Sequence, residues 1–211
     1  MGMKNSSIQL AVELNMNGVF DSVKNIIDMG TQEIRINYEQ LKNLYQNAGL
    51  EFDESKYEIL KNFPKGDRLP TSFIWEDIGI HNYTCLDINK TNDSVFVDLN
   101  LPFDDIEHLE KYDLVTDFGN NEHVFNVGEA YKTMYKLCKV NGYIWIKQSV
   151  YNGNGFFNYD ISFFEGMAAA NRLGVVYSAY VVKTNTYDEY LIPCNKNLFN
   201  VKISHTKTLM R

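Results

Sequence analysis

The chain has 211 residues, a formal net charge of −7 and a hydrophobic content of 45%. This length fits one domain, which can bury a core without a disulfide or a structural metal. The acidic balance argues against non-specific binding to nucleic acid, because such binding usually needs a basic face. The three cysteines are scattered and show no Cys-x-x-Cys spacing, so they are typical of reduced thiols rather than of a zinc site.

The start of the chain lacks the basic stretch and long apolar core of a signal peptide. No run of residues approaches the roughly 18 apolar positions that span a bilayer. We therefore expect a cytoplasmic protein with no membrane partner. His108 and His205 have no neighbouring ligand residues at metal-binding spacing, and His81 is more typical of a surface residue than of a ligand, so we expect no metal.

Strands alternate with helices along the chain, which predicts a parallel sheet covered by helices on both faces. An amphipathic helix over Ile8–Phe20 precedes a short apolar strand, Val23–Met29. Apolar residues at helical spacing predict a helix over Asn37–Ala48 that ends at Gly49. The other elements predicted in this half are a short helix over Glu51–Leu60, a loop over Phe63–Pro70, a helix over Thr71–Ile78 with Thr71 as N-cap, and strands over Tyr83–Ile88 and Ser94–Asp98.

In the second half, a strand over Tyr112–Phe118 precedes a helix over Val124–Cys138. Asn141-Gly142 predicts a tight turn into a strand over Tyr143–Val150. The remaining predictions are a helix over Ile161–Asn171 that Gly174 ends, a strand over Val175–Lys183, and two final strands, Glu189–Cys194 and Phe199–His205, which we expect to be antiparallel.

Four aspartates, Asp28, Asp87, Asp98 and Asp117, each fall at or near the carboxyl end of a predicted strand. In an open parallel sheet, ligands bind outside these ends, where the strand order reverses. Four carboxylates at one edge therefore predict a site for a ligand that carries hydroxyls and amines. The alternative is that each aspartate begins a loop or caps a helix.

Three blocks carry a resemblance to a known family: YDLVTDFGNNEHVFN (Tyr112–Asn126), KLCKVNGYIWI (Lys136–Ile146) and GFFNYDISFFEGMAAAN (Gly155–Asn171). Over about Asp21–Val182 the chain resembles class I S-adenosylmethionine-dependent methyltransferases, and in particular a bacterial subgroup with a Gly-x-x-Glu-His element after the fourth strand. The resemblance implies one Rossmann-like α/β domain over residues 1–211, a three-layer sandwich. Its mostly parallel, seven-stranded sheet would end in an antiparallel strand, with an insertion at about residues 49–75 between strands one and two.

The resemblance also implies which residues contact S-adenosylmethionine. Gly30 would let the backbone approach the methionine part, since no side chain blocks that approach. Gln32 replaces the second glycine of the family's Asp-x-Gly-x-Gly pattern, so a simple strand-to-loop turn stays open as the alternative. The other implied contacts are Asp28 and Thr31 in the same loop, Asp87 and Ile88 at the ribose, Asp98 and Leu99 at the adenine, and Asp117, Phe118 and Gly119 beside the reacting sulfonium.

Glu122 and His123 are the candidate catalytic pair. A hydroxyl acceptor must lose a proton during methyl transfer, and the pKa of histidine suits a base near neutrality. We interpret His123 as the base or an acceptor-orienting group, and Glu122 as a cofactor contact or an orienting group. The alternative is that both residues only cap and pack the following helix, since glutamate is favoured in a first helical turn.

Asn158 and Tyr159 are the candidate substrate-binding residues, and we expect the segments Asp53–Pro70 and Gly153–Asp160 to form the acceptor rim. The expected reaction is O-methylation of a sugar or small metabolite, such as a surface-polysaccharide precursor, with no nucleic-acid partner. One alternative is an inactive cofactor-binding partner subunit of the same fold. A nicotinamide-dependent oxidoreductase ranks last, because the Gly-x-Gly-x-x-Gly fingerprint is absent at Asp28–Glu33. A homodimer stays open.

Overall fold

The computed structural model describes residues 2–89, 94–183, 189–194 and 205–210. Its main sheet has eight strands in the order β5-β4-β2-β6-β7-β10-β8-β9. In that order the bounds are Ser94–Phe96, Asn82–Asp87, Asn25–Met29, Tyr112–Phe118, Cys138–Ser149, His205–Met210, Val175–Lys183 and Glu189–Pro193. The five strands from β5 to β7 are parallel, and β10 is antiparallel to both β7 and β8.

This architecture confirms the predicted Rossmann-like α/β class with a mostly parallel sheet. The predicted count of seven strands is wrong by one, because β9 pairs antiparallel with β8 and extends the edge of the sheet. The predicted strand over Phe199–His205 lies mostly outside the described residues. The last described strand, β10, follows it and inserts between β7 and β8.

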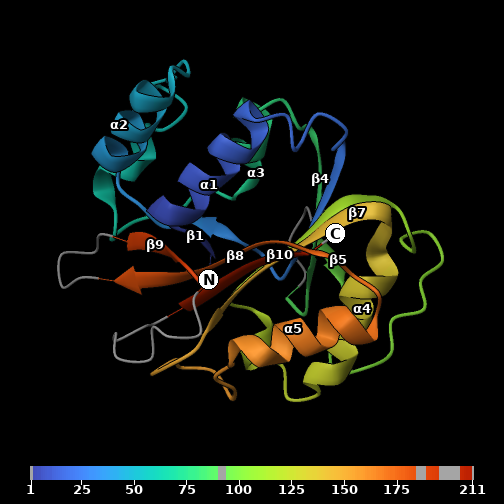
Figure 1. Ribbon diagram of the computed structural model, residues 1–211. Coiled ribbons are helices and arrows are strands. Elements are labelled where there is room, and N and C mark those ends of the chain that lie inside the picture. The colour runs from blue at the N-terminus through green and yellow to red at the C-terminus, as the bar shows by residue number, and fades with distance from the viewer. Residues whose placement is uncertain (1, 90–93, 184–188, 195–204, 211) are drawn as a thin grey trace.

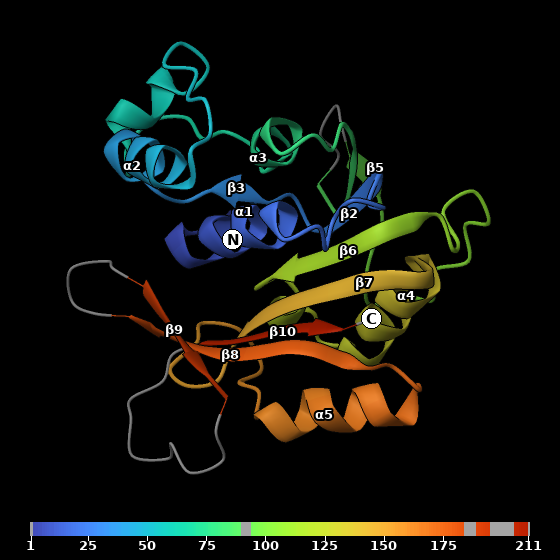
Figure 2. The same ribbon diagram turned by 45° about the horizontal axis from the view of Figure 1, so that its top comes forward.

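Helices cover both faces of the sheet (Figures 1 and 2). Helices α1 (Asn5–Met16), α2 (Tyr38–Ala48) and α3 (Ser72–Asp77) lie on one side, and α4 (Val127–Leu137) and α5 (Ile161–Ala170) lie on the other. Successive strand residues point to opposite faces. Accordingly, Ile26 packs in the core beneath α1 and α3, whereas Ile27 packs in the core against α4 and α5.

Several predicted boundaries shift. The helix predicted over Glu51–Leu60 is only a 3₁₀ turn, η1 (Glu58–Asn62). The helix predicted over Val124–Cys138 starts at Val127, because a separate 3₁₀ turn, η2 (Asn121–His123), precedes it. The predicted Asn141-Gly142 turn lies inside β7, where Asn141 adopts a left-handed φ of 65°. Thr71 precedes α3 as predicted, but its side chain makes no cap hydrogen bond.

A second, two-stranded sheet pairs β1 (Gly2–Met3) in parallel with β3 (Glu33–Ile34). This small sheet could not be predicted from the sequence, because two-residue strands carry no periodic pattern. Beyond this pair, the backbone N–H of Arg35 donates to the carbonyl oxygen of Met3 at 2.8 Å. The pairing therefore brings Lys4 and Arg35, which are far apart in the sequence, close together in space.

Helix α2 has a complete capping box at its first turn. The side chain of Asn37 accepts from the backbone N–H of Gln40 at 2.9 Å, and the side chain of Gln40 accepts from the backbone N–H of Asn37. Gly49 ends the helix in the left-handed conformation, as predicted.

Among the described residues, no helix is both long and apolar enough to cross a membrane.

Asn37→Ala should lower the free energy of unfolding by about 1 kcal/mol, because alanine cannot accept the hydrogen bond from Gln40. Asn47→Ala is the matched control, since Asn47 is an exposed residue within the same helix. That change should leave stability unchanged or raise it slightly, because alanine is the better helix former. Urea denaturation measures both variants, and equal effects in the two would contradict the cap.

Candidate active site

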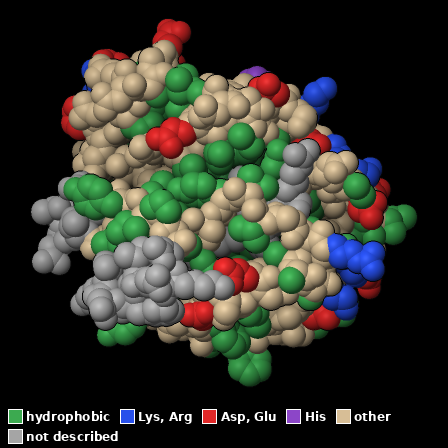
Figure 3. Space-filling model, in the orientation of Figure 1, with side chains coloured by type: hydrophobic (Ala, Val, Ile, Leu, Met, Phe, Trp, Pro, Cys, Tyr) green, Lys and Arg blue, Asp and Glu red, His purple; other side chains and the backbone are tan. Residues whose placement is uncertain are grey.

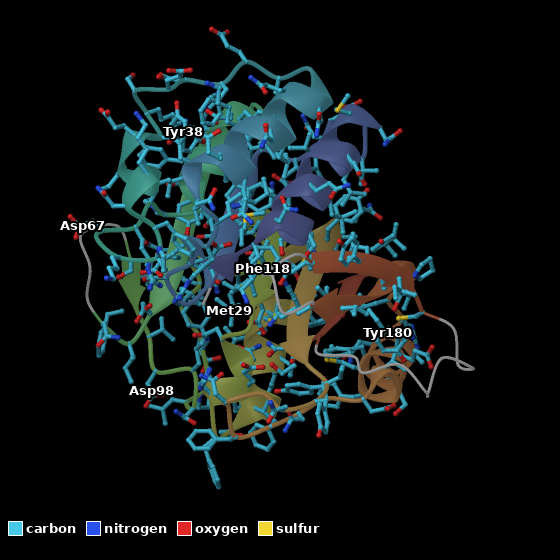
Figure 4. The ribbon with its side chains drawn as sticks, turned by 90° about the vertical axis from the view of Figure 1, so that its left-hand side faces the viewer. Met29, Tyr38, Asp67, Asp98, Phe118 and Tyr180 are labelled. Carbon is cyan, nitrogen blue, oxygen red and sulfur yellow. The ribbon has the colours of Figure 1, made fainter. Side chains whose placement is uncertain are left out.

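The strand order reverses between β2 and β6. From β2 the chain continues to β4 and β5 on one side, and from β6 it continues to β7 on the other. A crevice outside the carboxyl ends of the strands is expected at such a switch point. In Figure 4, Met29 and Phe118, the last residues of β2 and β6, lie near the middle of the molecule, with Asp98 and Tyr180 toward opposite sides.

Gly30 forms a left-handed turn directly after β2. Its φ is 77°, and its N–H donates to the carbonyl oxygen of Leu86 at 2.7 Å. A Cβ at this position would clash with the side-chain amide of Asn120, which lies against the glycine. The turn therefore requires glycine. The atoms that an added Cβ would meet belong to the side chain of Asn120 and not to other backbone.

The rest of this loop folds inward. The side chain of Gln32 is buried and its Nε2 donates to the carbonyl oxygen of Met29 at 2.8 Å. Its Oε1 is buried without a hydrogen-bond partner among the described residues. Gln32 therefore closes the turn from within, and its contact with a cofactor stays a prediction. Thr31 differs, because its backbone N–H donates to Oδ2 of Asp87 at 2.8 Å and so joins the ends of β2 and β4.

Asp28 is fully buried on the sheet face that packs beneath α1 and α3. Its carboxylate accepts hydrogen bonds from the hydroxyls of Thr71 at 2.6 Å, Tyr83 at 2.8 Å and Thr116. Burial raises the pKa of Asp28 to about 6, although the three hydroxyls oppose the rise. The carboxylate is enclosed by the hydroxyls that it binds, and its contact with a ligand stays a prediction.

Asp117 is fully buried on the opposite face of the sheet. Its Oδ1 accepts from the backbone N–H groups of Asn120 at 2.8 Å and Asn121 at 3.3 Å, and its Oδ2 accepts from Nε2 of Gln148. Burial raises the pKa of Asp117 to about 7, and the nearby charge of Glu122 adds to the rise. The carboxylate anchors the loop after β6, and its contact with a ligand likewise stays a prediction.

Asp87 and Asp98 remain accessible at the strand ends. Besides Thr31, Asp87 accepts hydrogen bonds from the backbone and side chain of Asn89. Desolvation opposes the ionisation of Asp87, but these hydrogen bonds outweigh it and lower its pKa. Asp98 accepts from the backbone and side chain of Asn100.

Ile88 is 57% exposed beyond Asp87, whereas Leu99 is buried beside Asp98. Thus, of the four predicted carboxylates, the structure leaves Asp87 and Asp98 facing outward. The four aspartates lie at the strand ends as predicted, but their side chains do not converge on one site.

Glu122 and His123 lie together in turn η2. Oε2 of the buried Glu122 accepts from the backbone N–H of Ser149 at 3.0 Å, and its Oε1 lies 3.6 Å from Nε2 of His123. The side chain of His123 is 35% exposed. Because α4 begins only at Val127, neither residue caps that helix. This geometry disfavours the capping alternative. It leaves a partly exposed imidazole beside a carboxylate that the N–H of Ser149 holds in place.

The loop after β7 places the two predicted substrate contacts in different surroundings. Tyr159 is buried, its hydroxyl donates to the carbonyl oxygen of Asn121 at 3.4 Å, and its ring packs on Phe164. Burial raises its pKa to about 12. Asn158 uses its Oδ1 to accept from the backbone N–H of Gly153 at 2.9 Å. The side chain of Tyr159 therefore packs in the core, whereas the exposed Asn158 shapes the loop, and their contacts with a substrate stay predictions.

A cavity of about 390 Å³ opens beside the carboxyl ends of β6 and β7. Gly153 and Asn154 line it, so part of the predicted Gly153–Asp160 rim is present, whereas none of the described lining residues comes from Asp53–Pro70. The residues that define its chemistry are Lys4 and Arg35 beside the small sheet, Gly119 and Glu122 after β6, Lys147 and Ser149 on β7, and Lys183 at the end of β8.

None of the four basic residues of this cavity was predicted from the sequence as a site residue. One signal was available, since Lys147 follows the apolar residues Tyr143–Ile146 in a strand that is buried. A lysine in such a strand is rarely buried without a partner or a role. The described residues contain no group of three or more histidine, cysteine, aspartate or glutamate side chains able to hold a metal ion.

Comparisons with known proteins give structural neighbours only. No protein-family model matches the chain, and no curated protein matches it. The 1,6-didemethyltoxoflavin-N1-methyltransferase of Burkholderia thailandensis, solved with 1,6-didemethyltoxoflavin and S-adenosylhomocysteine, superposes with a TM-score of 0.51 at 9% identity, over 97% of this chain and 78% of that chain. At this identity the similarity shows the fold alone.

Two further S-adenosylmethionine-dependent methyltransferases match at a TM-score of 0.49. The protein from Clostridium acetobutylicum has 8% identity, over 95% of this chain and 89% of its own. The protein from Archaeoglobus fulgidus has 11% identity, over 97% of this chain and 94% of its own.

Asp117→Asn should become more stable relative to the wild type as the pH rises from about 4 to about 7. In this window the folded wild type keeps a proton on Asp117 that the unfolded chain releases, so its free energy of unfolding falls. Asparagine has no charge to bury, and its amide can donate to Oε1 of Gln148, which has no partner among the described residues.

Urea denaturation across this pH range tests the effect. Asp160→Asn is the control, because hydrogen bonds lower the pKa of the largely exposed Asp160, and its titration therefore changes stability only below about pH 4. A difference between Asp117→Asn and the wild type that does not vary with pH would rule out the predicted titration.

Proposed function

We propose that this protein is an S-adenosylmethionine-dependent methyltransferase acting on a small-molecule acceptor. The observation that carries the proposal lies at the switch point of the sheet. There the left-handed turn at Gly30, which only the side chain of Asn120 covers within the distance of a Cβ, is joined through Thr31 to the ionised, half-exposed carboxylate of Asp87. A shared fold with the Burkholderia thailandensis enzyme, whose structure contains S-adenosylhomocysteine, supports the same reading.

The residues at the ends of β2, β4 and β5 would hold such a cofactor. Gly30 and Thr31 would hold its methionine part by backbone contacts once the side chain of Asn120 moves aside, and the partly exposed carboxylate of Asp87 would accept from a ribose hydroxyl. Asp98 and the apolar Leu99 would border the adenine. When bound, the cofactor supplies an electrophilic methyl group on a sulfonium.

We propose O-methylation of a sugar or small metabolite as the reaction. His123 would take the hydroxyl proton of the acceptor, since its imidazole is accessible. Glu122, fixed by the N–H of Ser149, would orient the imidazole. A cavity of about 390 Å³ next to Gly119 and Glu122 suits a small acceptor rather than a macromolecule.

A second candidate function is a cofactor-binding partner subunit without turnover. Two observations favour it: the side chain of Asn120 lies over Gly30, and Gln32 fills the place of a second glycine. The two functions differ in chemistry rather than in binding. Formation of S-adenosylhomocysteine that rises when a sugar nucleotide is added supports the enzyme. Binding of S-adenosylmethionine without such turnover supports the partner subunit.

Gly30→Ala should weaken binding of S-adenosylmethionine at least tenfold, because the new Cβ projects from the backbone that the cofactor would approach. Gly49→Ala is the matched control, since Gly49 has a similar φ of 69° and no atom within 4 Å of an added Cβ. Both changes should cost about 1 kcal/mol of stability. Only the change at Gly30 should alter the affinity.

Calorimetry with S-adenosylmethionine, S-adenosylhomocysteine and NAD measures this on folded protein. Wild-type protein that binds NAD, or that binds none of the three ligands, would contradict the proposed cofactor. Equal affinity in the Gly30 and Gly49 variants would remove Gly30 from the site.

His123→Ala should lower turnover of a hydroxyl acceptor by about 10²–10⁴-fold through loss of the base. The affinity for S-adenosylmethionine should stay the same, because His123 is not among the proposed cofactor contacts. His81→Ala, at an exposed histidine before β4, serves as the control and should keep full turnover. Wild-type turnover in the His123 variant with bound acceptor would exclude the base role.

A further inference from the structure

The cavity beside β6 and β7 has a charge opposite to that of the whole protein. Of the described residues that line it, four are cations, Lys4, Arg35, Lys147 and Lys183, and one is a carboxylate, Glu122. The chain as a whole has a net charge of −7. In Figure 3 acidic side chains are scattered over the face shown, whereas basic ones gather mainly at its right-hand edge. We call this site the cationic cavity.

Its lysines lie around one buried carboxylate. Nζ of the buried Lys147 lies 3.2 Å from Oε2 of Glu189 and 3.3 Å from Oγ of Ser7. Nζ of Lys4 lies 4.0 Å from Oε1 of the same glutamate. Lys147 is therefore held in place by Glu189, while Lys4 approaches the same carboxylate from a more exposed position.

Lys183 adds a third ammonium group at this point. Desolvation, followed by repulsion from Lys4 and Lys147, lowers its pKa to about 7, although Glu189 opposes the shift. Lysines that lower each other's pKa in this way hold positive charge at a cost in free energy. A bound anion would reduce that cost.

Arg35 supplies a second type of donor. Its Nη2 lies 3.2 Å from Oε2 of Glu33, and Nη1 of Arg68 lies 2.9 Å from the same oxygen. Two guanidinium groups thus use one carboxylate oxygen. Nε of Arg35 is buried without a hydrogen-bond partner among the described residues, which is unfavourable for a donor. Guanidinium groups match carboxylates and phosphates in shape.

We propose that the cationic cavity binds the carboxylate or phosphate group of an anionic small molecule, and, resting on the proposed function, that this molecule is the methyl acceptor. Glu122 lines the same cavity and lies 3.6 Å from His123. An anion held by Lys183 and Arg35 would therefore share its cavity with the carboxylate that lies beside the proposed base. With four basic side chains and one carboxylate in its lining, the cavity would disfavour cationic acceptors.

The test is calorimetry on the full chain without cofactor, at low salt, with four probes. Inorganic phosphate and glucose 6-phosphate represent phosphates, glucuronate represents carboxylates, and glucose is the neutral control. We expect at least one anion to bind and glucose not to bind. The stronger of glucose 6-phosphate and glucuronate identifies the anionic group. Binding of glucose as tight as that of the anions, or binding of none of the anions, would overturn the proposal.

Two variants locate the site. Lys183→Met and Arg35→Gln should each weaken anion binding at least tenfold, the loss expected for one charged hydrogen bond. Lys132→Met is the matched control, because Lys132 is an exposed lysine on α4 and does not line the cationic cavity. Unchanged affinity in both cavity variants, with melting curves showing that they are folded, would place the anion elsewhere.

A separate titration with S-adenosylmethionine distinguishes failure of this inference from failure of the proposed function. Cofactor binding without anion binding overturns the anion site and leaves the methyltransferase proposal standing. Anion binding without cofactor binding supports the cationic cavity and overturns the assignment of the anion as a methyl acceptor.

Discussion

In the parallel pairing of β2 with β6, Ile26 lies opposite Leu114 and Asp28 opposite Thr116. This register fixes the level at which the two strands end, and so places the turn at Gly30 against Asn120 in the loop after β6. It also sends the two penultimate aspartates to opposite faces. Asp28 joins the hydroxyls beneath α1 and α3, whereas Asp117 binds the amides of the loop above its own strand. Each buried carboxylate thus holds neighbouring groups in place at the end of its own strand, from within the core.

The sequence was sufficient for the strands and insufficient for the direction of their side chains. Tyr112–Phe118 and Val175–Lys183 were predicted with the observed bounds, because both are continuous runs rich in β-branched and aromatic residues. A strand buried on both faces reads as apolar throughout. Its pattern therefore does not say which face Asp28 or Asp117 joins. Tyr159 posed the same difficulty, since an aromatic side chain in a loop suits either a pocket or a core.

The cationic cavity could not be predicted because its residues are far apart in the chain. Lys4 and Arg35 meet through two-residue strands, and Lys147 and Lys183 come from two strands, β7 and β8, that β10 separates in the sheet. Net charge gives no warning of such a site, since it averages over the whole surface. A buried ion pair such as Lys147–Glu189 also contributes little net stability, because desolvation opposes the attraction. A role in holding the other lysines in place accounts for it better than stability does.

On the proposed function, the sheet divides into two halves with different tasks. The ends of β2, β4 and β5 carry Gly30, Asp87 and Asp98, which suit a cofactor with hydroxyls and an amine. The ends of β7 and β8 carry the lysines, which suit an anionic acceptor. The segment Gly119–His123 lies between these halves, because β6 separates β2 from β7 in the sheet. It is anchored by Asp117 below and by the contact of Glu122 with Ser149. A segment fixed at both ends and bordered by both sites is where a methyl donor and an acceptor can be aligned, and alignment is most of what such a displacement requires.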